Sequence, residues 1–127
     1  MKFFLCLFAA AVTATAAPRT LVLTGTLTNT TGEVSAPARL ELTLEGDNVS
    51  ARLVTSPPLT GTGSLTGRCV EGWCDLSGSL DGGFAVKFRG VLNARDFRGT
   101  YVATPPSGAV QYGRFELAPI AAPPATK

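Results

Sequence analysis

Eight short runs with two-residue hydrophobic alternation, separated by seven turn signals, constrain this chain more than any other feature. The turn signals combine Gly, Asn, Asp and Pro, which accept left-handed backbone or preset a turn. The runs between them are rich in Thr, Val, Leu and Phe, which favour strands. We therefore expect eight β-strands, over residues 20–28, 37–45, 48–55, 59–69, 73–80, 84–92, 96–104 and 109–117.

The alternation places one face of each expected strand in a core. Phe84, Val86 and Phe88, for example, alternate with Lys87 and Arg89. Such alternation is typical of a sheet with one dry and one solvated face. Eight strands without a long crossover fit a meander, and closure removes both sheet edges. The sequence predicts an all-β fold, a single eight-stranded antiparallel meander closed into a barrel with one hairpin disulfide. A β-sandwich is the alternative.

A short motif, a large apolar residue followed by a polar residue and Gly, recurs along the chain. Its glycines, all at inward-facing positions, are Gly25, Gly61, Gly67, Gly78, Gly90 and Gly99. Glycine inside a strand marks a bend, a bulge or a close approach. Its repetition favours sharp coiling into a narrow barrel. The other interpretation is that small inward residues leave a lumen for a ligand.

The N-terminus predicts export. Lys2 precedes an apolar run over 3–12, and Ala14-Thr15-Ala16 fits a small-x-small cleavage site, which indicates a signal peptide over 1–16. The apolar run is shorter than the roughly 20 residues that span a bilayer. We therefore expect a secreted or periplasmic/cell-envelope protein that does not span the membrane after signal removal. The expected β-barrel domain covers 17–118, and a disordered Pro/Ala tail covers 119–127.

Cys69 and Cys74 are the two cysteines that remain after the signal peptide. An exported chain is expected to oxidise such a pair. Both take inward parity on one hairpin, as a bridge requires. The chain has no histidine, so a thiolate zinc site lacks ligands and a Ser–His or Cys–His nucleophile cannot form. We expect no metal, no cofactor and no enzymatic activity.

The candidate binding residues are mostly cations on the outer face of the last three strands. Four of them form a predicted basic stripe, with Tyr112 as a stacking aromatic. These cations are Lys87, Arg89, Arg98 and Arg114. A polyanion such as an acidic envelope polymer would fit this stripe, whereas the alternative is an ordinary solvated face. Trp73, the only tryptophan, is either a hairpin packing residue or a ring that stacks on a ligand.

Two segments resemble a known family. The run Leu23-Thr24-Gly25-Thr26-Leu27-Thr28-Asn29-Thr30-Thr31-Gly32 resembles the opening strand and turn of the avidin family. Residues 84–88 and 97–101 look like its later strands. The resemblance implies an avidin-like, calycin-like small secreted up-and-down barrel. That family has tryptophan where Leu27 stands, and the tryptophans that stack on biotin are absent here.

The sequence favours a secreted non-catalytic binding module. Its ligand is expected to be a small apolar molecule in the barrel mouth or a polyanion on the basic face. The alternative is a cell-envelope structural or assembly protein with no ligand of its own.

Overall fold

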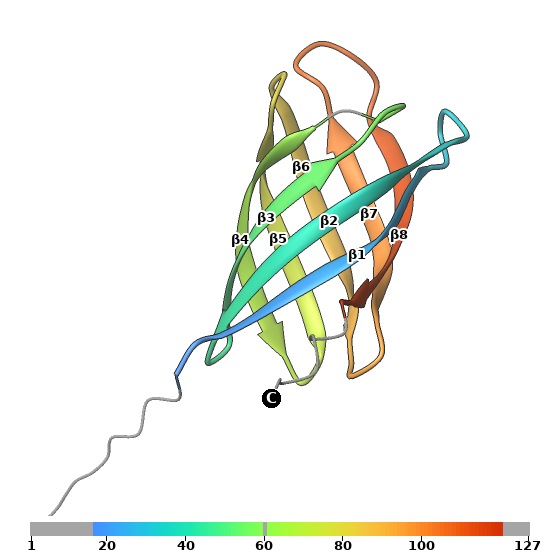
Figure 1. The fold of residues 1–127 in the computed structure, drawn as a ribbon. Coiled ribbons are helices and arrows are strands. Elements are labelled where there is room, and N and C mark those ends of the chain that lie inside the picture. The colour runs from blue at the N-terminus through green and yellow to red at the C-terminus, as the bar shows by residue number, and fades with distance from the viewer. Residues whose placement is uncertain (1–16, 60, 121–127) are drawn as a thin grey trace, which may run out of the picture.

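Successive antiparallel hairpins carry the chain once around a closed barrel in the computed structural model, which describes residues 17–59 and 61–120 (Figure 1). The strands are β1 (Arg19–Asn29), β2 (Val34–Glu45), β3 (Asn48–Thr55), β4 (Thr62–Val70), β5 (Trp73–Leu80), β6 (Phe84–Leu92), β7 (Phe97–Thr104) and β8 (Gln111–Pro119). β8 pairs with β1 and closes the ring. The predicted meander and barrel are confirmed, and the β-sandwich does not form. The predicted signal peptide over 1–16 and residues 121–127 of the predicted tail lie outside the described residues.

Three strands, β2, β4 and β8, differ from their predicted bounds by two residues or more, whereas β1 and β7 differ by no more than a single residue at either end. β2 begins three residues early because its ladder with β1 continues to the Asn29–Val34 pair. β4 begins at Thr62, directly after Gly61, whose carbonyl accepts hydrogen bonds from both the N–H and the hydroxyl of Thr55. β8 starts and ends two residues late, and the Ile120 N–H beyond it still donates to the Val22 carbonyl.

Inward side chains fill the lumen as the alternation predicts. Phe88, Phe97 and Phe115 are each at most 2% exposed. Phe97 packs edge-on against Phe115 with centroids 4.8 Å apart, and Phe115 in turn lies 5.3 Å from Phe88. Tyr101 stacks on Phe88 at 5.2 Å. This aromatic column runs along the inside of β6–β8, and a cavity lies beyond it at one end of the barrel.

The inward glycines mark close approach of neighbouring strands. At seven of them an added Cβ would meet a carbonyl oxygen of the adjacent strand closely enough that something must shift. They are Gly25, Gly63, Gly67, Gly78, Gly90, Gly99 and Gly113. Gly90 and Gly99 lie directly opposite each other, and the Phe115 ring packs over the Gly90 Cα. These contacts favour the coiling interpretation of the motif over the open lumen.

The disulfide links the two strands of one hairpin at the end of the barrel where β1 begins and β8 ends (Figure 1). Cys69 and Cys74 are direct cross-strand partners on β4 and β5, with Cα atoms 4.0 Å apart and a bond between their Sγ atoms. Cys74 is buried in the core. The predicted bridge is therefore confirmed. In the part of the chain that the structure describes, no helix is long and apolar enough to cross a membrane.

Candidate ligand site at the barrel mouth

One end of the barrel holds a cavity of about 190 Å³. We call this end the mouth; the β1–β2, β3–β4, β5–β6 and β7–β8 turns surround it, at the top of Figure 1. Its walls are mainly apolar, and four polar side chains also face it. The apolar lining comprises Leu27, Pro58, Leu59, Leu80, Phe84, Val86, Phe88 and Ala103. The polar lining comprises Asn29, Thr55, Tyr101 and Gln111.

Asn29 is buried at the mouth, at 8% exposed. It continues the inward parity of Leu27 at the end of β1. Its Oδ1 accepts a hydrogen bond of 2.9 Å from the Gly32 N–H, and its Nδ2 donates to the Oε1 of Gln111 on β8. Both bonds fix the Asn29 amide. Gln111 accepts through its Oε1, and its Nε2 group donates to no other described residue. Gln111 therefore presents N–H groups to the cavity.

Tyr101 supplies a second hydrogen-bonding group. Its ring lies between Phe88, on which it stacks, and the backbone of Gly113, where a Cβ would collide with the phenol. Burial raises the pKa of the Tyr101 hydroxyl, so the phenol is neutral at physiological pH. The hydroxyl has no hydrogen-bond partner among the described residues. Since every fully buried side-chain polar atom of those residues has a partner, the Tyr101 oxygen is not fully buried. It is therefore reachable from the mouth and can donate to a ligand.

Thr55 has a structural task. Its hydroxyl donates to the Gly61 carbonyl at 2.8 Å, which closes the β3–β4 loop. The same loop places Leu59 against the core cluster at the mouth. Thr55 thus shapes the wall, and its oxygen keeps a lone pair for a ligand.

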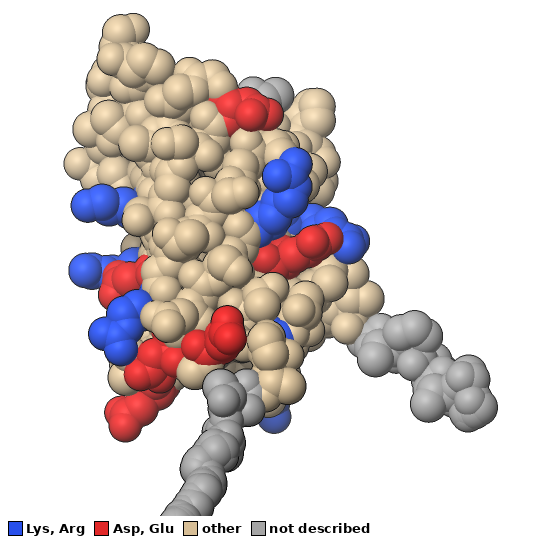
Figure 2. Space-filling model, turned by 90° about the vertical axis from the view of Figure 1, so that its left-hand side faces the viewer, with Lys and Arg blue, Asp and Glu red and all other residues tan. Residues whose placement is uncertain are grey.

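Charged side chains are absent from the lining that the structure describes for this cavity. On the face shown in Figure 2, Lys, Arg, Asp and Glu gather mainly over the middle and lower parts of the barrel, and some acidic atoms lie near the mouth. A charged group in an apolar cavity without a counter-charge is strongly disfavoured. The mouth therefore suits an uncharged ligand.

The six residues proposed from the sequence all lie outside this cavity. Lys87, Arg89, Arg98, Arg114 and Tyr112 face outward from β6–β8, as their parity predicts. Two acidic residues, which the predicted basic stripe did not include, lie beside these arginines. Arg89 pairs with Asp75 at 2.9 Å, which raises the pKa of Arg89, and Arg98 pairs with Asp96 at 3.0 Å.

Trp73, the sixth residue, is 65% exposed on the outer wall, near the turn that follows β4. It lies between Val70 and Val91 in the cross-strand ladder. This placement puts it at the opposite end of the barrel from the mouth. Trp73 can therefore stack on a ligand only on the outer surface.

Sequence reasoning missed Asn29, Tyr101 and Gln111 as site residues. The available signal was a polar residue at inward parity near a strand end, which Asn29 and Gln111 both satisfy. Comparison with protein-family models, curated proteins and solved structures finds no match.

Proposed function

We propose that this protein is a secreted, non-catalytic binding module that holds one small, mainly apolar and uncharged ligand in the barrel mouth. The observation that carries the proposal is the cavity itself, where apolar walls surround the donors of Tyr101 and Gln111. Apolar pockets with a few convergent polar groups are the usual form of small-molecule sites. The ligand gains affinity from burial of its apolar body and orientation from one hydrogen-bonding group.

Cavity volume sets the ligand size. About 190 Å³ lies below the range of roughly 300–1,000 Å³ that drug-sized ligands occupy. A molecule of one or two small rings would fit inside, and a longer one would emerge between the loops. The preferred polar group is a carbonyl or amide oxygen, because the free mouth groups are mostly donors.

Two further points support the proposal that the protein is non-catalytic and exported. The cavity lining holds amides, hydroxyls and apolar groups, without the paired acid and base that proton transfer requires. Export is supported by the signal-like segment at 1–16 and by the disulfide, a bond that persists in oxidising compartments. A relation to the avidin family remains a proposal; Leu27, where that family has tryptophan, lines this cavity.

A direct test uses the neutral fluorophore 1-aminoanthracene as a probe of the mouth. Wild type should bind it saturably with a stoichiometry of one. Ala103→Leu fills the cavity from β7 and should weaken binding at least about tenfold, through loss of space for the probe. Ala85→Leu makes the same change on the exposed outer wall of β6 and should bind like wild type.

The proposal fails if wild type shows no saturable binding, or if Ala103→Leu, folded by circular dichroism, binds as wild type does. Absence of binding would favour the structural or assembly role in the cell envelope.

A further inference from the structure

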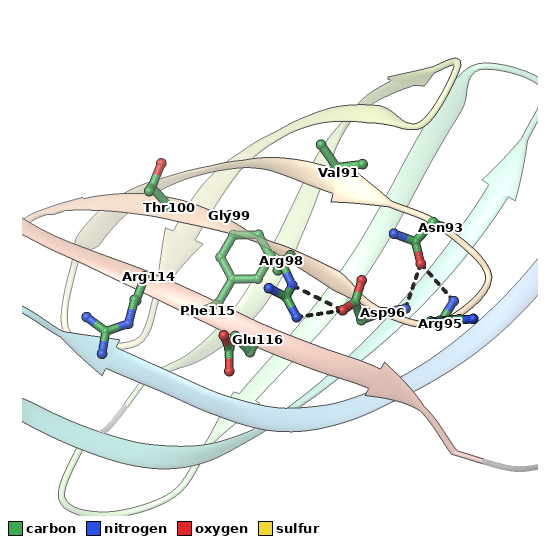
Figure 3. A pocket seen from close by; sticks show the side chains of 10 residues that line it. All are labelled: Val91, Asn93, Arg95, Asp96, Arg98, Gly99, Thr100, Arg114, Phe115 and Glu116. Carbon is green, nitrogen blue, oxygen red and sulfur yellow. Dashed lines mark hydrogen bonds and ion pairs between the residues drawn. The ribbon is translucent and has the colours of Figure 1, made fainter.

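A groove of about 660 Å³ crosses the outer wall of β6, β7 and β8, at the end of the barrel away from the mouth (Figure 3). Its outward side chains include Val91, Arg98, Thr100, Arg114 and Glu116. The β6–β7 turn adds further polar groups at one side. In Figure 3 the Arg98 and Arg114 side chains come from neighbouring strands and lie over the outer surface of the sheet. The groove is therefore built mainly on rigid strands.

Arginines outnumber acids in this groove by three to two. Arg98 is fixed by Asp96, whose Oδ2 accepts hydrogen bonds from Nε at 3.1 Å and pairs with Nη2 at 3.0 Å. Asn93 fixes the turn, because its Oδ1 accepts from the N–H groups of Arg95 (2.8 Å) and Asp96 (3.0 Å). The ion pairs between described residues leave Arg95 and Arg114 without a carboxylate partner. Arg95 and Arg114 are thus available to an anion, and Arg98 keeps its Nη1 group, which no described residue uses.

Trp73 extends the groove by one strand. The outward row of the sheet runs from Trp73 to Val91, then Arg98, then Glu116, each directly opposite the next. At about 4.8 Å per strand this row is about 14 Å long. Directly beside Trp73, the Cys69–Cys74 bridge locks the hairpin that carries the indole. The backbone that carries this large exposed ring is therefore fixed beside an arginine groove, which lowers the backbone entropy lost on binding.

We propose that this outer groove binds a carboxylated polysaccharide, with Trp73 packed against a sugar ring and Arg98 and Arg114 binding its carboxylates. The amphipathic indole suits the C–H face of a sugar ring. Guanidinium forks match carboxylates in a bidentate geometry. Asp96 and Glu116 accept hydrogen bonds from sugar hydroxyl groups. This mixture of cations and acids fits a ligand that carries both anions and donors.

The same features argue against two other occupants. A DNA strand offers phosphates but few hydroxyl donors for Asp96 and Glu116, and successive bases require several stacking aromatics. A protein partner requires a larger apolar core than the Val70–Trp73–Val91 row, which is bordered by the charged row of Arg68, Asp75 and Arg89.

The single tryptophan of the chain makes the test direct, because all indole fluorescence comes from Trp73. Oligogalacturonate should change the emission of Trp73 and protect it from acrylamide quenching, and the affinity should fall as salt is added. Neutral dextran fragments and oligo-dT should neither change the emission of Trp73 nor protect it from acrylamide quenching. The double variant Arg98→Gln/Arg114→Gln should bind at least about tenfold more weakly. Its matched control, Arg39→Gln/Arg52→Gln on the β2–β3 wall, should bind like wild type.

Calorimetry with Trp73→Ala adds a second readout, and this variant should lose oligogalacturonate binding while it still binds 1-aminoanthracene at the mouth. The proposal is overturned if oligogalacturonate leaves Trp73 emission unchanged, if dextran or oligo-dT binds as tightly, or if the groove and control double variants bind equally. None of these outcomes bears on the mouth, so the two proposals fail independently.

Discussion

Gly99→Ala is the most informative single perturbation of the barrel. An added Cβ at Gly99 would lie 2.5 Å from the Gly90 Cα and still nearer the Arg89 carbonyl oxygen. Both atoms belong to the backbone of β6, so no side chain can rotate away. Carbon atoms pack at about 3.5–4.0 Å, so β6 and β7 would have to part by about 1 Å. We expect a loss of about 3 kcal/mol in the free energy of unfolding, the upper part of the overpacking range.

Gly32→Ala is the matched control. Gly32 lies in the β1–β2 turn, where the atom nearest to an added Cβ is the Asn29 Oδ1 at 3.8 Å, an ordinary contact. Its stability should stay within about 0.5 kcal/mol of wild type. Urea unfolding gives both free energies, and thermal unfolding of Gly99→Ala should show a midpoint about 15 °C lower. If Gly99→Ala is as stable as Gly32→Ala, the close approach of β6 and β7 at this pair is wrong.

Two other predictions concern the disulfide and the mouth. Denatured, unreduced protein should contain no titratable thiol from Cys69 or Cys74, and two free thiols would contradict the bridge. Reduction should lower the free energy of unfolding by only about 2 kcal/mol, because the closed loop is short. Since the pKa of Tyr101 is raised in the folded state, the folded protein binds more protons than the unfolded chain above about pH 10, and stability should fall as pH rises there. Tyr101→Phe should therefore lose less stability than wild type between about pH 9 and pH 11 in urea unfolding, whereas an equal loss in both would refute the burial effect.

Local chemistry explains why the barrel was predictable from the sequence. The turns are marked by glycines with positive φ, such as Gly46, Gly72 and Gly82, and strand parity then follows from the alternation. Parity also placed Cys69 and Cys74 on one face of one hairpin. The start of β4 was not predictable, because Leu59 and Gly61 continue the strand pattern, whereas the Gly61 carbonyl accepts hydrogen bonds from Thr55 just before the strand begins.

The candidate site was less accessible to sequence reasoning for two physical reasons. A cavity depends on how far the core side chains fill the lumen, and no local pattern shows that the aromatic column ends at Tyr101. Asn29 also resembled an ordinary turn residue, although its parity points inward. On the outer wall, parity placed Arg89 and Arg98 correctly, but their acids come from a neighbouring strand and from a turn, so the pairing with Asp75 and Asp96 was not anticipated.

Methyl NMR of the isotopically labelled protein, titrated with 1-aminoanthracene, tests the central claim most directly. Binding in the mouth should shift the methyl signals of Leu27, Leu59 and Val86, which line the cavity, along one saturable curve. The methyl signals of Leu42 and Val49, buried in the core outside that lining, should stay in place. Saturable shifts at Leu42 or Val49 without shifts at the mouth, or no saturable shift at all, would contradict a ligand site in the barrel mouth.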